Sequence, residues 1–550
     1  MKNKSVILFL LIFGFKISIS AQNFLKNGEI HGSFQTDCQY YFKDTAIGAT
    51  KVPEDFLMNG FANFLYTNSK FNAGFRFESY QNALKGFDVR YKGNGIPYRF
   101  ASYKTDNVEI TVGNFYEQFG SGMILRTYED RGLGFDNSID GIRIKSELIK
   151  GITLKGLVGN QRSFFTKGEG IVRGADGEFF LNDIFKKLSE KKTKLTFGGS
   201  FVSKYQNSND PIYYFPENVA ACAGRLNFTS GKINLYGEYA YKINDPSAVN
   251  NLIYKPGNAI YSSITFSQKG LGILLSAKRV DNMDFRSERN ATGNNLLINY
   301  LPALTKQHTY SLASMYPYAT QPNGEIGFYA QVIYTVKKNT WLGGNYGTVI
   351  NLNYSIANSI DKEKTNDTIP LNEKGTLGYK SDFFKIGNEK YFEDFNAEVT
   401  HKFSKKIKVI LFFANLVYNK DIIEGHTGEG IVYANTFALD LSYKLDEKNN
   451  LRMELQHLYT EQDKGNWASG LLEYTISPKW FFTVSDDWNY GNSNSKKQIH
   501  YYTASLGFVK NATRIAINYG RQNEGVICAG GVCRNVPSMN GITMSITSNF

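Results

Sequence analysis

The sequence predicts an all-β protein: a single closed antiparallel transmembrane β-barrel of about 24 strands, within a range of 22–26. Three observations predict this fold. The 550-residue chain has a mean hydropathy of −0.34 and no run of 18 consecutive apolar residues after its first residues, which excludes a helical membrane protein. Strand-length segments alternate apolar and polar residues along the chain, and the connections between them alternate between short and long.

The composition agrees with a β-rich chain. Aromatic residues make up 15% of the sequence, with 36 Tyr and 41 Phe, while Gly is frequent at 51 and Pro is scarce at 12. Tyr and Phe favour strands, and their abundance without long hydrophobic runs indicates strands with one apolar and one polar face.

The first residues form a secretory signal peptide. Two lysines precede an apolar run from Val6 to Phe15, and the small residues Ser18, Ser20 and Ala21 follow it. Cleavage after Ser20 or after Ala21 fits this pattern, and the alternative is an N-terminal anchor helix. We therefore predict a signal peptide over residues 1–21 and an exported barrel over residues 22–550, with no separate second domain.

The alternation that defines the strands is clearest at the C-terminus. In "GITMSITSNF", Ile542, Met544, Ile546 and Phe550 share one face, and the residues between them are polar. A last strand ending on an aromatic residue is similar to the targeting signal of bacterial outer-membrane barrels, which makes Phe550 the expected barrel signal. The same period recurs in other segments, among them residues 71–78, 108–113, 233–242, 436–443, 451–456 and 472–476.

The connections predict which end of the barrel faces which compartment. Tight connections such as "VKNAT" and "SPK" alternate with long ones such as "RQNEGVICAGGVCRNVPSMN", and a very long loop spans roughly residues 356–390. Residues 281–324 are either one long loop or contain a hidden hairpin. Outer-membrane barrels have short periplasmic turns and longer extracellular loops, and we expect that arrangement here.

Charges of both signs lie on the polar faces of the predicted strands. If these faces line the lumen, they form either a hydrated wall with cross-strand ion pairs or a selectivity lining for a polar solute, and the mixed signs argue against strong ion selectivity. The residues are Arg76, Glu78, Glu109, Arg143, Lys145, Glu147, Glu238, Lys242, Glu398, Lys402, Asp440, Arg452, Glu454 and Arg514.

One connection combines apolar residues with dense charge. "EQFGSGMILRTYEDRGLGFDNSIDG" lies between a strand ending near Phe115 and a strand starting near Ile139. Its part "GMILRTY" is too apolar for water, so we expect an inward-folded constriction loop rather than an ordinary surface loop. Buried charges need partners, and we expect the arginines to pair with the carboxylates of the same stretch: Arg126, Arg131 and Arg143 with Glu129, Asp130, Asp136 and Asp140.

Other candidate chemistry is sparse. Cys528 and Cys533 in "CAGGVC" predict a disulfide in an exported protein, whereas Cys38 and Cys222 lie far apart in sequence. Six scattered histidines and the absence of G-x-S-x-G, H-E-x-x-H and P-loop motifs predict no enzyme, no metal and no cofactor. The net charge of +12 includes no basic stripe typical of a nucleic-acid site, so no nucleic-acid partner is expected.

The stretch "EQFGSGMILRTYEDRGLGFDNSIDGIRI", with the signal peptide ending "SAQN", resembles the uncharacterised DUF6029 family of Bacteroidota outer-membrane β-barrel proteins. The resemblance implies the Gram-negative outer membrane and a barrel, but no activity and no functional residue. Two hypotheses follow. The first is a channel or porin-like pore for a polar solute, and the alternative is a non-conducting structural or accessory subunit of an outer-membrane secretion or assembly complex. Expected partners are outer-membrane lipid, the barrel-assembly machinery during biogenesis, and other outer-membrane proteins.

Overall fold

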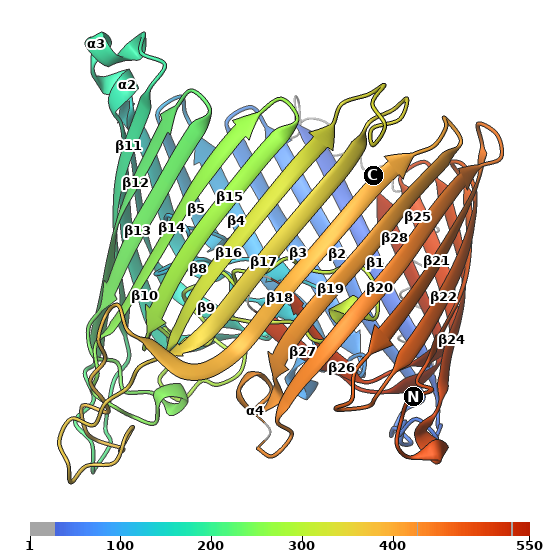
Figure 1. The fold of residues 1–550 in the computed structure, drawn as a ribbon. Helices are drawn as coiled ribbons and strands as arrows, with labels where there is room; N and C mark the ends of the chain where they lie inside the picture. The colour runs from blue at the N-terminus through green and yellow to red at the C-terminus, as the bar shows by residue number, and fades with distance from the viewer. Residues whose placement is uncertain (1–27, 426, 530–531) are drawn as a thin grey trace, which may run out of the picture.

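A computed structural model describes residues 28–425, 427–529 and 532–550, so the predicted signal peptide over residues 1–21 lies outside the described residues. Twenty-four antiparallel strands form one sheet. Pairing of the first strand, β1 (Glu29–Phe42), with the last, β28 (Met539–Asn549), closes this sheet into a barrel (Figure 1). The predicted closed antiparallel barrel of about 24 strands is therefore confirmed.

The other wall strands follow one another around the barrel in sequence order. They are β2 (Phe56–Asn68), β3 (Phe71–Gln81), β4 (Gly93–Lys104), β5 (Val108–Phe115), β8 (Ile139–Ile149), β9 (Ile152–Ser163), β10 (Thr166–Phe180), β11 (Lys194–Tyr205), β12 (Asn218–Ser230), β13 (Ile233–Lys242), β14 (Gly257–Gln268), β15 (Leu271–Asp281), β16 (Glu325–Val336), β17 (Thr348–Ile360), β18 (Ile386–Lys402), β19 (Ile407–Asn419), β20 (Ile431–Lys444), β21 (Asn449–Tyr459), β22 (Trp467–Ile476), β23 (Trp480–Trp488), β24 (His500–Lys510) and β25 (Thr513–Gln522).

Four short strands form two hairpins apart from the wall: β6 (Glu129–Asp130) with β7 (Phe135–Asp136), and β26 (Gly525–Ala529) with β27 (Val532–Val536). The helical pieces are single turns: α2 (Leu181–Ile184), α3 (Lys186–Ser189), α4 (Lys420–Ile423), η1 (Val89–Tyr91), η2 (Ala248–Asn250), η3 (Ala313–Met315) and η4 (Ser495–Lys497). Among the described residues, none of these helices has the length and apolar character needed to cross a bilayer.

The two ends of the barrel differ in their connections. Gly32 N donates to Phe550 O at 2.9 Å, so the first and last strands meet at one end, where most connections are tight, such as Ser69–Lys70. We call this the short-turn end and the opposite one the long-loop end. Three connections depart from the expected alternation, and one of them is residues 337–347 between β16 and β17, a long connection at the short-turn end. Residues 181–193 carry α2 and α3 at the short-turn end, and residues 164–165 make a two-residue turn at the long-loop end, with Phe164 at φ 56°.

Two loop boundaries are now defined. The connection expected over roughly residues 356–390 is shorter, because β17 continues to Ile360 and β18 begins at Ile386. Residues 282–324 contain no wall strand, which settles the choice between one long loop and a hidden hairpin in favour of one long loop.

The alternation of side chains sorts the wall into two faces. On β8, Ile142 and Ile144 are exposed on the outer face, while Arg143 between them points inward and pairs with Glu109 of β5. The same holds around the barrel, where Phe75, Val158 and Leu506 are among many large apolar side chains exposed to the outside. The wall therefore has an apolar exterior and a polar interior.

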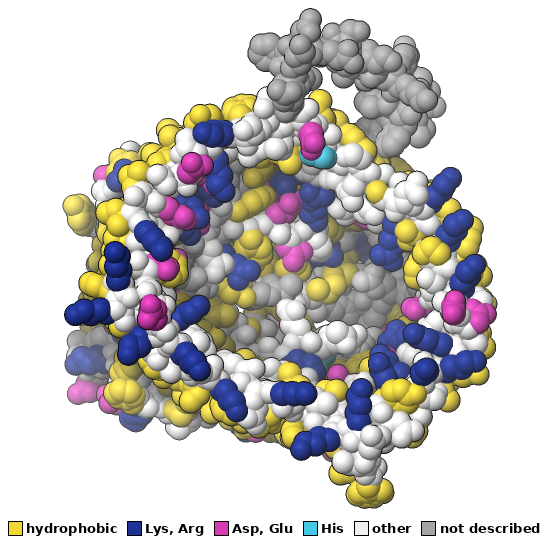
Figure 2. All heavy atoms as spheres, turned by 90° about the horizontal axis from the view of Figure 1, so that it is seen from above, with side chains coloured by type: hydrophobic (Ala, Val, Ile, Leu, Met, Phe, Trp, Pro, Cys, Tyr) yellow, Lys and Arg dark blue, Asp and Glu magenta, His cyan; other side chains and the backbone are white. Residues whose placement is uncertain are grey.

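Figure 2 shows the barrel from the short-turn end, where its mouth is hollow and lysine and arginine side chains surround the rim. Lysines occur in the turns of this end, including Lys70, Lys269, Lys405 and Lys448. The polar lumen is thus open to solvent from the short-turn end, and the structures that narrow it lie toward the long-loop end.

Candidate functional site

Three connections at the long-loop end fold into the lumen. They are the first inward segment (residues 116–138), the second inward segment (residues 282–324) and the hairpin segment (residues 523–529 and 532–538), whose strands β26 and β27 lie within the barrel in Figure 1. Each bonds to other parts of the interior. Ser121 N donates to Glu238 on β13, Leu312 N donates to Gln456 on β21, and Gln307 donates to Cys528 O.

The first and second inward segments share a hydrophobic core with the inner wall. Phe119, Met123, Ile124 and Leu125 pack with Met283, Phe285 and Ile298, and all are fully buried. Small wall residues, among them Ala221, Ala240 and Ala259, make room for them. Burial of each large side chain contributes about 1.5–3 kcal/mol. This explains why the apolar part of the first segment, "GMILRTY", does not lie in water.

Hydrogen bonds join these two segments into one body. Arg126 N donates to Ile298 O at 2.9 Å, and Tyr300 N donates to Gly122 O at 2.9 Å. The amide of Asn299 donates to Met123 O at 3.1 Å and to Met283 O at 2.7 Å, so one side chain bridges both segments. A displacement of one segment would therefore disturb the other.

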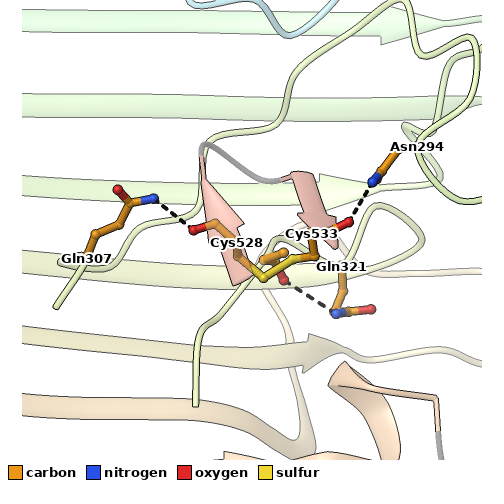
Figure 3. The surroundings of a disulfide bond; sticks show 6 residues. Asn294, Gln307, Gln321, Cys528 and Cys533 are labelled. Atoms are coloured by element: carbon orange, nitrogen blue, oxygen red, sulfur yellow. Dashed lines mark hydrogen bonds between the residues drawn. A yellow bond between two sulfur atoms is a disulfide. The ribbon is translucent and has the colours of Figure 1, made fainter. Parts of the chain in front are cut away.

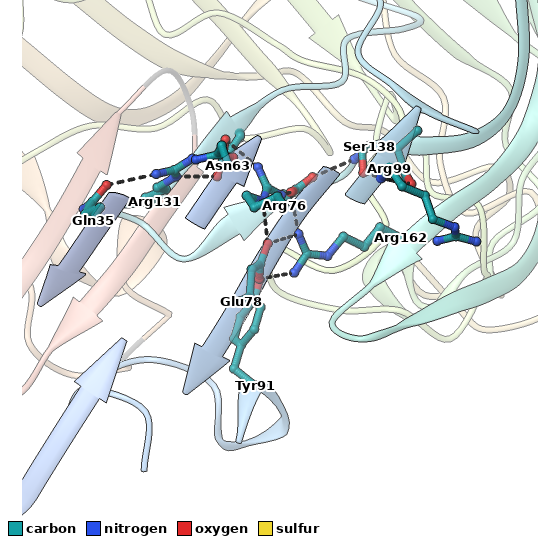
Figure 4. A network of polar contacts seen from close by, with 12 residues as sticks. Gln35, Asn63, Arg76, Glu78, Tyr91, Arg99, Arg131, Ser138 and Arg162 are labelled. Atoms are coloured by element: carbon teal, nitrogen blue, oxygen red, sulfur yellow. Dashed lines mark hydrogen bonds and ion pairs between the residues drawn. The ribbon is translucent and has the colours of Figure 1, made fainter. Parts of the chain in front are cut away.

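A buried ion-pair cluster attaches the first inward segment to the wall (Figure 4). Arg76 of β3 pairs with Glu78 at 2.7 Å, with Glu129 at 2.8 Å, and with Asp136. Arg162 of β9 pairs with Glu78 and Asp136, each at 2.6 Å. Two wall strands that are far apart in sequence thus hold the same carboxylate of the segment.

The charges of this cluster balance. Arg76, Arg162 and Arg131 face Glu78, Asp136 and Glu129, so three positive groups meet three negative ones. Burial alone would raise the pKa of Asp136, but Arg162 and Arg76 outweigh it and hold that pKa below its usual value. Asp136 also accepts a hydrogen bond from the Tyr116 hydroxyl at 3.0 Å. Without Glu129 and Asp136 of the segment, the wall residues Arg76 and Arg162 would share Glu78 alone among these carboxylates.

The expected pairing within the charged stretch holds for one pair. Arg131 Nε lies 2.7 Å from Glu129, and its Nη1 also donates to Gln35 of β1 at 3.0 Å. Asp130 instead accepts from Leu133 N at 3.0 Å within its turn. Arg126 has no carboxylate partner among the described residues, and its guanidinium lies 4.0 Å from the ring centre of Tyr300. The sequence could not show that the wall supplies most of the partners.

Arg143 and Asp140 belong to strand β8, not to the segment. Arg143 points into the lumen and pairs with Glu109 and, at 3.4 Å, with Glu117. Asp140 lies on the same strand face as the exposed Ile142, where it pairs with Arg99 at 3.4 Å and Lys167 at 2.8 Å. The expectation that Asp140 lines the lumen is wrong, because strand alternation places it on the outer face.

The second inward segment reaches the opposite wall, which sequence analysis missed. His308 lies 2.9 Å from Asp394 of β18, and Ser311 donates to Asp487 of β23 at 3.4 Å. Lys306 lies 3.6 Å from Glu398. The wall residues Asp394, Glu398 and Asp487 belong to no recognisable sequence motif and have no common spacing. The unusual length of the connection between β15 and β16 was the signal that could have identified it.

The hairpin segment rests on the second inward segment. Cys528 and Cys533 form a disulfide across β26 and β27, while Cys38 and Cys222 are free thiols. Asn294 donates to Cys533 O at 2.5 Å and Gln307 to Cys528 O at 3.4 Å (Figure 3). The disulfide-linked hairpin is therefore held inside the lumen from the side of residues 282–324.

Two neighbouring cavities lie between the inward segments and the wall. The outer cavity, of about 880 Å³, lies near the long-loop end and is lined by Phe87, Phe164 and Arg534 among others. The inner cavity, of about 510 Å³, lies against β22–β25, β28 and β1, where Gln39, Thr503, Asn518 and Thr543 line it. Both cavities share the lining residues Met315, Glu524, Gly525, Val526 and Val536.

Over the described ranges, no three His, Cys, Asp or Glu side chains are grouped so that they could hold a metal ion.

The fold and its interior define the class of the molecule: a large closed antiparallel β-barrel with an apolar exterior, a polar lumen and inward-folded connections that narrow it. The chain belongs to a family of unknown function (DUF6029), whose model matches residues 1–550.

No curated protein matches the sequence. Among solved structures, the chain is similar to the ferric enterobactin receptor PfeA from Pseudomonas aeruginosa, with 10% identity, a TM-score of 0.42, and coverage of 95% of this chain and 80% of that one. It is similar to the P pilus usher PapC translocation pore, with 9% identity, a TM-score of 0.43, and coverage of 95% and 99%. It is also similar to the outer membrane protein OpdK from Pseudomonas aeruginosa, with 8% identity, a TM-score of 0.34, and coverage of 95% and 98%.

Proposed function

We propose that the protein is a channel in the outer membrane of a Gram-negative bacterium, which lets a polar solute cross through its narrowed lumen. The apolar exterior supports a lipid environment, because exposed side chains such as Phe75 and Val158 would be unfavourable in water over so large an area. The short turns then face the periplasm and the long loops the outside.

The terminal aromatic residue fits the same proposal. Phe550 is exposed at the short-turn end, with its ring 6.2 Å from that of Phe64. In this position it is accessible to the barrel-assembly machinery, which we propose as a partner during biogenesis. Outer-membrane lipid is the partner of the mature barrel.

The observation that carries the channel proposal is the adjacency of the two cavities. The outer cavity lies near the long-loop end, the inner one lies along the polar wall of the lumen, and only a few side chains separate them. Met315, Val526 and Val536 line both cavities, and we call these three side chains the septum. A solute crossing the barrel would pass beside the hairpin segment, along a wall rich in Ser, Thr and Asn.

Conductance of the purified full-length barrel in planar lipid bilayers tests this proposal. We expect discrete single-channel steps smaller than those of an unobstructed barrel of this strand number, because the inward segments occupy part of the cross-section. A barrel that inserts but shows no steps over a wide range of voltage would refute the channel.

A second candidate function is a non-conducting accessory subunit of an outer-membrane secretion or assembly complex. The well-packed core around Met123, Ile124 and Leu125 favours it, because such packing is typical of a permanent plug. Affinity purification from native membranes distinguishes the two. A stable complex with other outer-membrane proteins, together with absent conductance, would support the subunit.

A further inference from the structure

Arg534 of β27 forms no ion pair with any residue that the structure describes. Its guanidinium lines the outer cavity and lies 4.3 Å from the ring centre of Phe87. Nε and Nη1 are closed off from solvent and have no hydrogen-bond acceptor among residues 28–425, 427–529 and 532–550, nor does any carboxylate there lie within ion-pair distance. Nη2 is not one of these closed-off atoms, and Arg534 as a residue lines the outer cavity.

The other basic groups around this cavity are already paired. Arg162 bonds to Glu78 and Asp136, Lys420 lies 2.9 Å from Asp463, and Lys464 lies 3.2 Å from Glu524. An unpaired charge in a partly closed site is unfavourable, and an anion that enters the cavity would compensate it. Burial lowers the pKa of Arg534, and the nearby Asp130 only partly offsets this effect.

The cavity around Arg534 has aromatic and charged walls. Of its carboxylates, Asp88, Asp136, Asp463 and Glu524 pair with Arg90, Arg162, Lys420 and Lys464, and Glu424 also lines it. Phe87 covers one face of the guanidinium, and Tyr91 and Phe164 line the same cavity, with their ring centres 4.7 Å apart. A volume of about 880 Å³ lies in the range of small-molecule sites. Aromatic walls with one strongly directional donor are typical of a site that takes a flat organic molecule by its charged end.

We propose that the outer cavity is a binding site for a small organic oxyanion, a carboxylate or a phosphate ester carrying a flat apolar group, with Arg534 as its anion partner. The proposal deepens the channel function and names its solute class, but binding can be measured without conductance. A lipid headgroup is a less suitable occupant, because the cavity lies among connections inside the barrel and not on its apolar exterior.

Isothermal titration calorimetry on the full-length barrel in detergent tests this site with three probes: benzoate, phenyl phosphate and the neutral isostere benzamide. We expect at least one anion to bind and benzamide to bind at least tenfold more weakly. If only benzoate binds, the site takes a carboxylate, and if only phenyl phosphate binds, it takes a phosphate ester. If both bind, the site recognises the oxyanion that the two probes share. Equal binding of benzamide, or no binding by either anion, overturns the proposal.

Substitution of the arginine separates binding from folding. Arg534→Met should weaken anion binding at least tenfold, while the thermal unfolding temperature of the ligand-free barrel stays the same or rises, because an uncompensated charge is removed. The matched control Arg173→Met, on the exposed outer face of β10, should bind as the wild type does. Unchanged affinity in Arg534→Met refutes the site. Loss of anion binding in this variant with intact conductance supports the site. In the wild-type barrel, anion binding without any conductance would refute the channel and leave the site standing.

Discussion

Arg162 Nη1 on β9 lies 2.6 Å from Asp136 Oδ2 on β7, and the two side chains are only 2% and 5% exposed. The pair joins a wall strand to the first inward segment. Because Arg76 of β3 holds the same carboxylate from the other side, Asp136 connects two separate parts of the wall. Asp136 is therefore a main polar attachment of the segment to the wall, beside the hydrophobic core that the segment shares with it.

Replacing Asp136 with Ala should release the first inward segment from the wall. The change leaves two buried guanidinium groups with one carboxylate fewer, and loss of one partner from a buried ion pair costs about 3–5 kcal/mol. We expect faster amide hydrogen exchange over residues 116–138 and, if the barrel conducts, larger single-channel steps. Hydrogen exchange followed by mass spectrometry measures the first effect directly.

Asp140→Ala is the matched control, because it removes an aspartate only four positions along the chain. Asp140 lies on the outer face and pairs with the half-exposed Arg99 and Lys167. Exposed ion pairs contribute about 0–1 kcal/mol, so exchange over residues 116–138 should not change. Equal effects of both substitutions would show that the buried cluster does not anchor the segment.

Acidification should release the segment in the same way. The pKa of Asp136 is lowered in the folded cluster by Arg162 and Arg76 relative to a free aspartate, whose pKa is about 3.9. Its contribution is therefore complete well above pH 4 and is lost as the pH falls through the lower folded pKa. Hydrogen exchange of residues 116–138 is compared with the intrinsic amide exchange rate at each pH between pH 6 and pH 3, and the protection of these amides should fall at the acidic end. Asp136→Asn should lack this component, and an unaltered acid response in that variant would contradict the assignment.

Much of the fold was predictable because each strand of a barrel wall alternates apolar and polar residues with a period of two. Ile542, Met544 and Ile546 alternate with polar residues, and this pattern follows from one lipid-facing and one lumen-facing side in every strand. Strand number and antiparallel order follow from the same period. The inward fold of residues 116–138 was also predictable, because their apolar half needs a core and their charges need partners.

The identity of those partners was not predictable. Arg76 and Arg162 lie on strands whose neighbours in the barrel are fixed by closure, and no local pattern shows which wall residues meet Asp136. The face of Asp140 was also not predictable, because a shift of one residue in a strand moves a side chain from the lumen to the outer face. The second inward segment is held by single contacts such as His308 with Asp394, which have no sequence signature.

The shared core of the inward segments gives a packing prediction. Leu125→Ala should cost about 2–5 kcal/mol of local stability, because Leu125 is fully buried between the two segments and the wall. Exchange should accelerate over residues 116–138 and also over 282–324, since Asn299 bonds to both parts. The outer-face control Leu506→Ala should leave both regions unchanged. Acceleration confined to the first segment would show that the two do not act as one body.

Reduction of the disulfide should loosen the hairpin segment without opening the barrel. Cys528 and Cys533 close a short loop, for which chain entropy gives about 2 kcal/mol of stabilisation. Cys528→Ser with Cys533→Ser should speed exchange over residues 525–536 while the thermal unfolding temperature of the wall stays constant. Cys38→Ser and Cys222→Ser, which change free thiols on wall strands, are the controls. A lower unfolding temperature of the whole barrel would mean that the disulfide supports the wall itself.

The septum between the two cavities gives the most direct test of the permeation route. Met315, Val526 and Val536 line both cavities, so shortening these side chains should join the two spaces. We expect Met315→Ala with Val536→Ala to increase single-channel conductance and to leave the unfolding temperature of the wall within a few degrees of the wild-type value. Val158→Ala with Leu506→Ala, on the lipid-facing side, removes similar volume without touching the route. Larger steps only in the septum variant would place the solute path beside the hairpin segment, whereas equal conductance in both variants would place it elsewhere in the lumen.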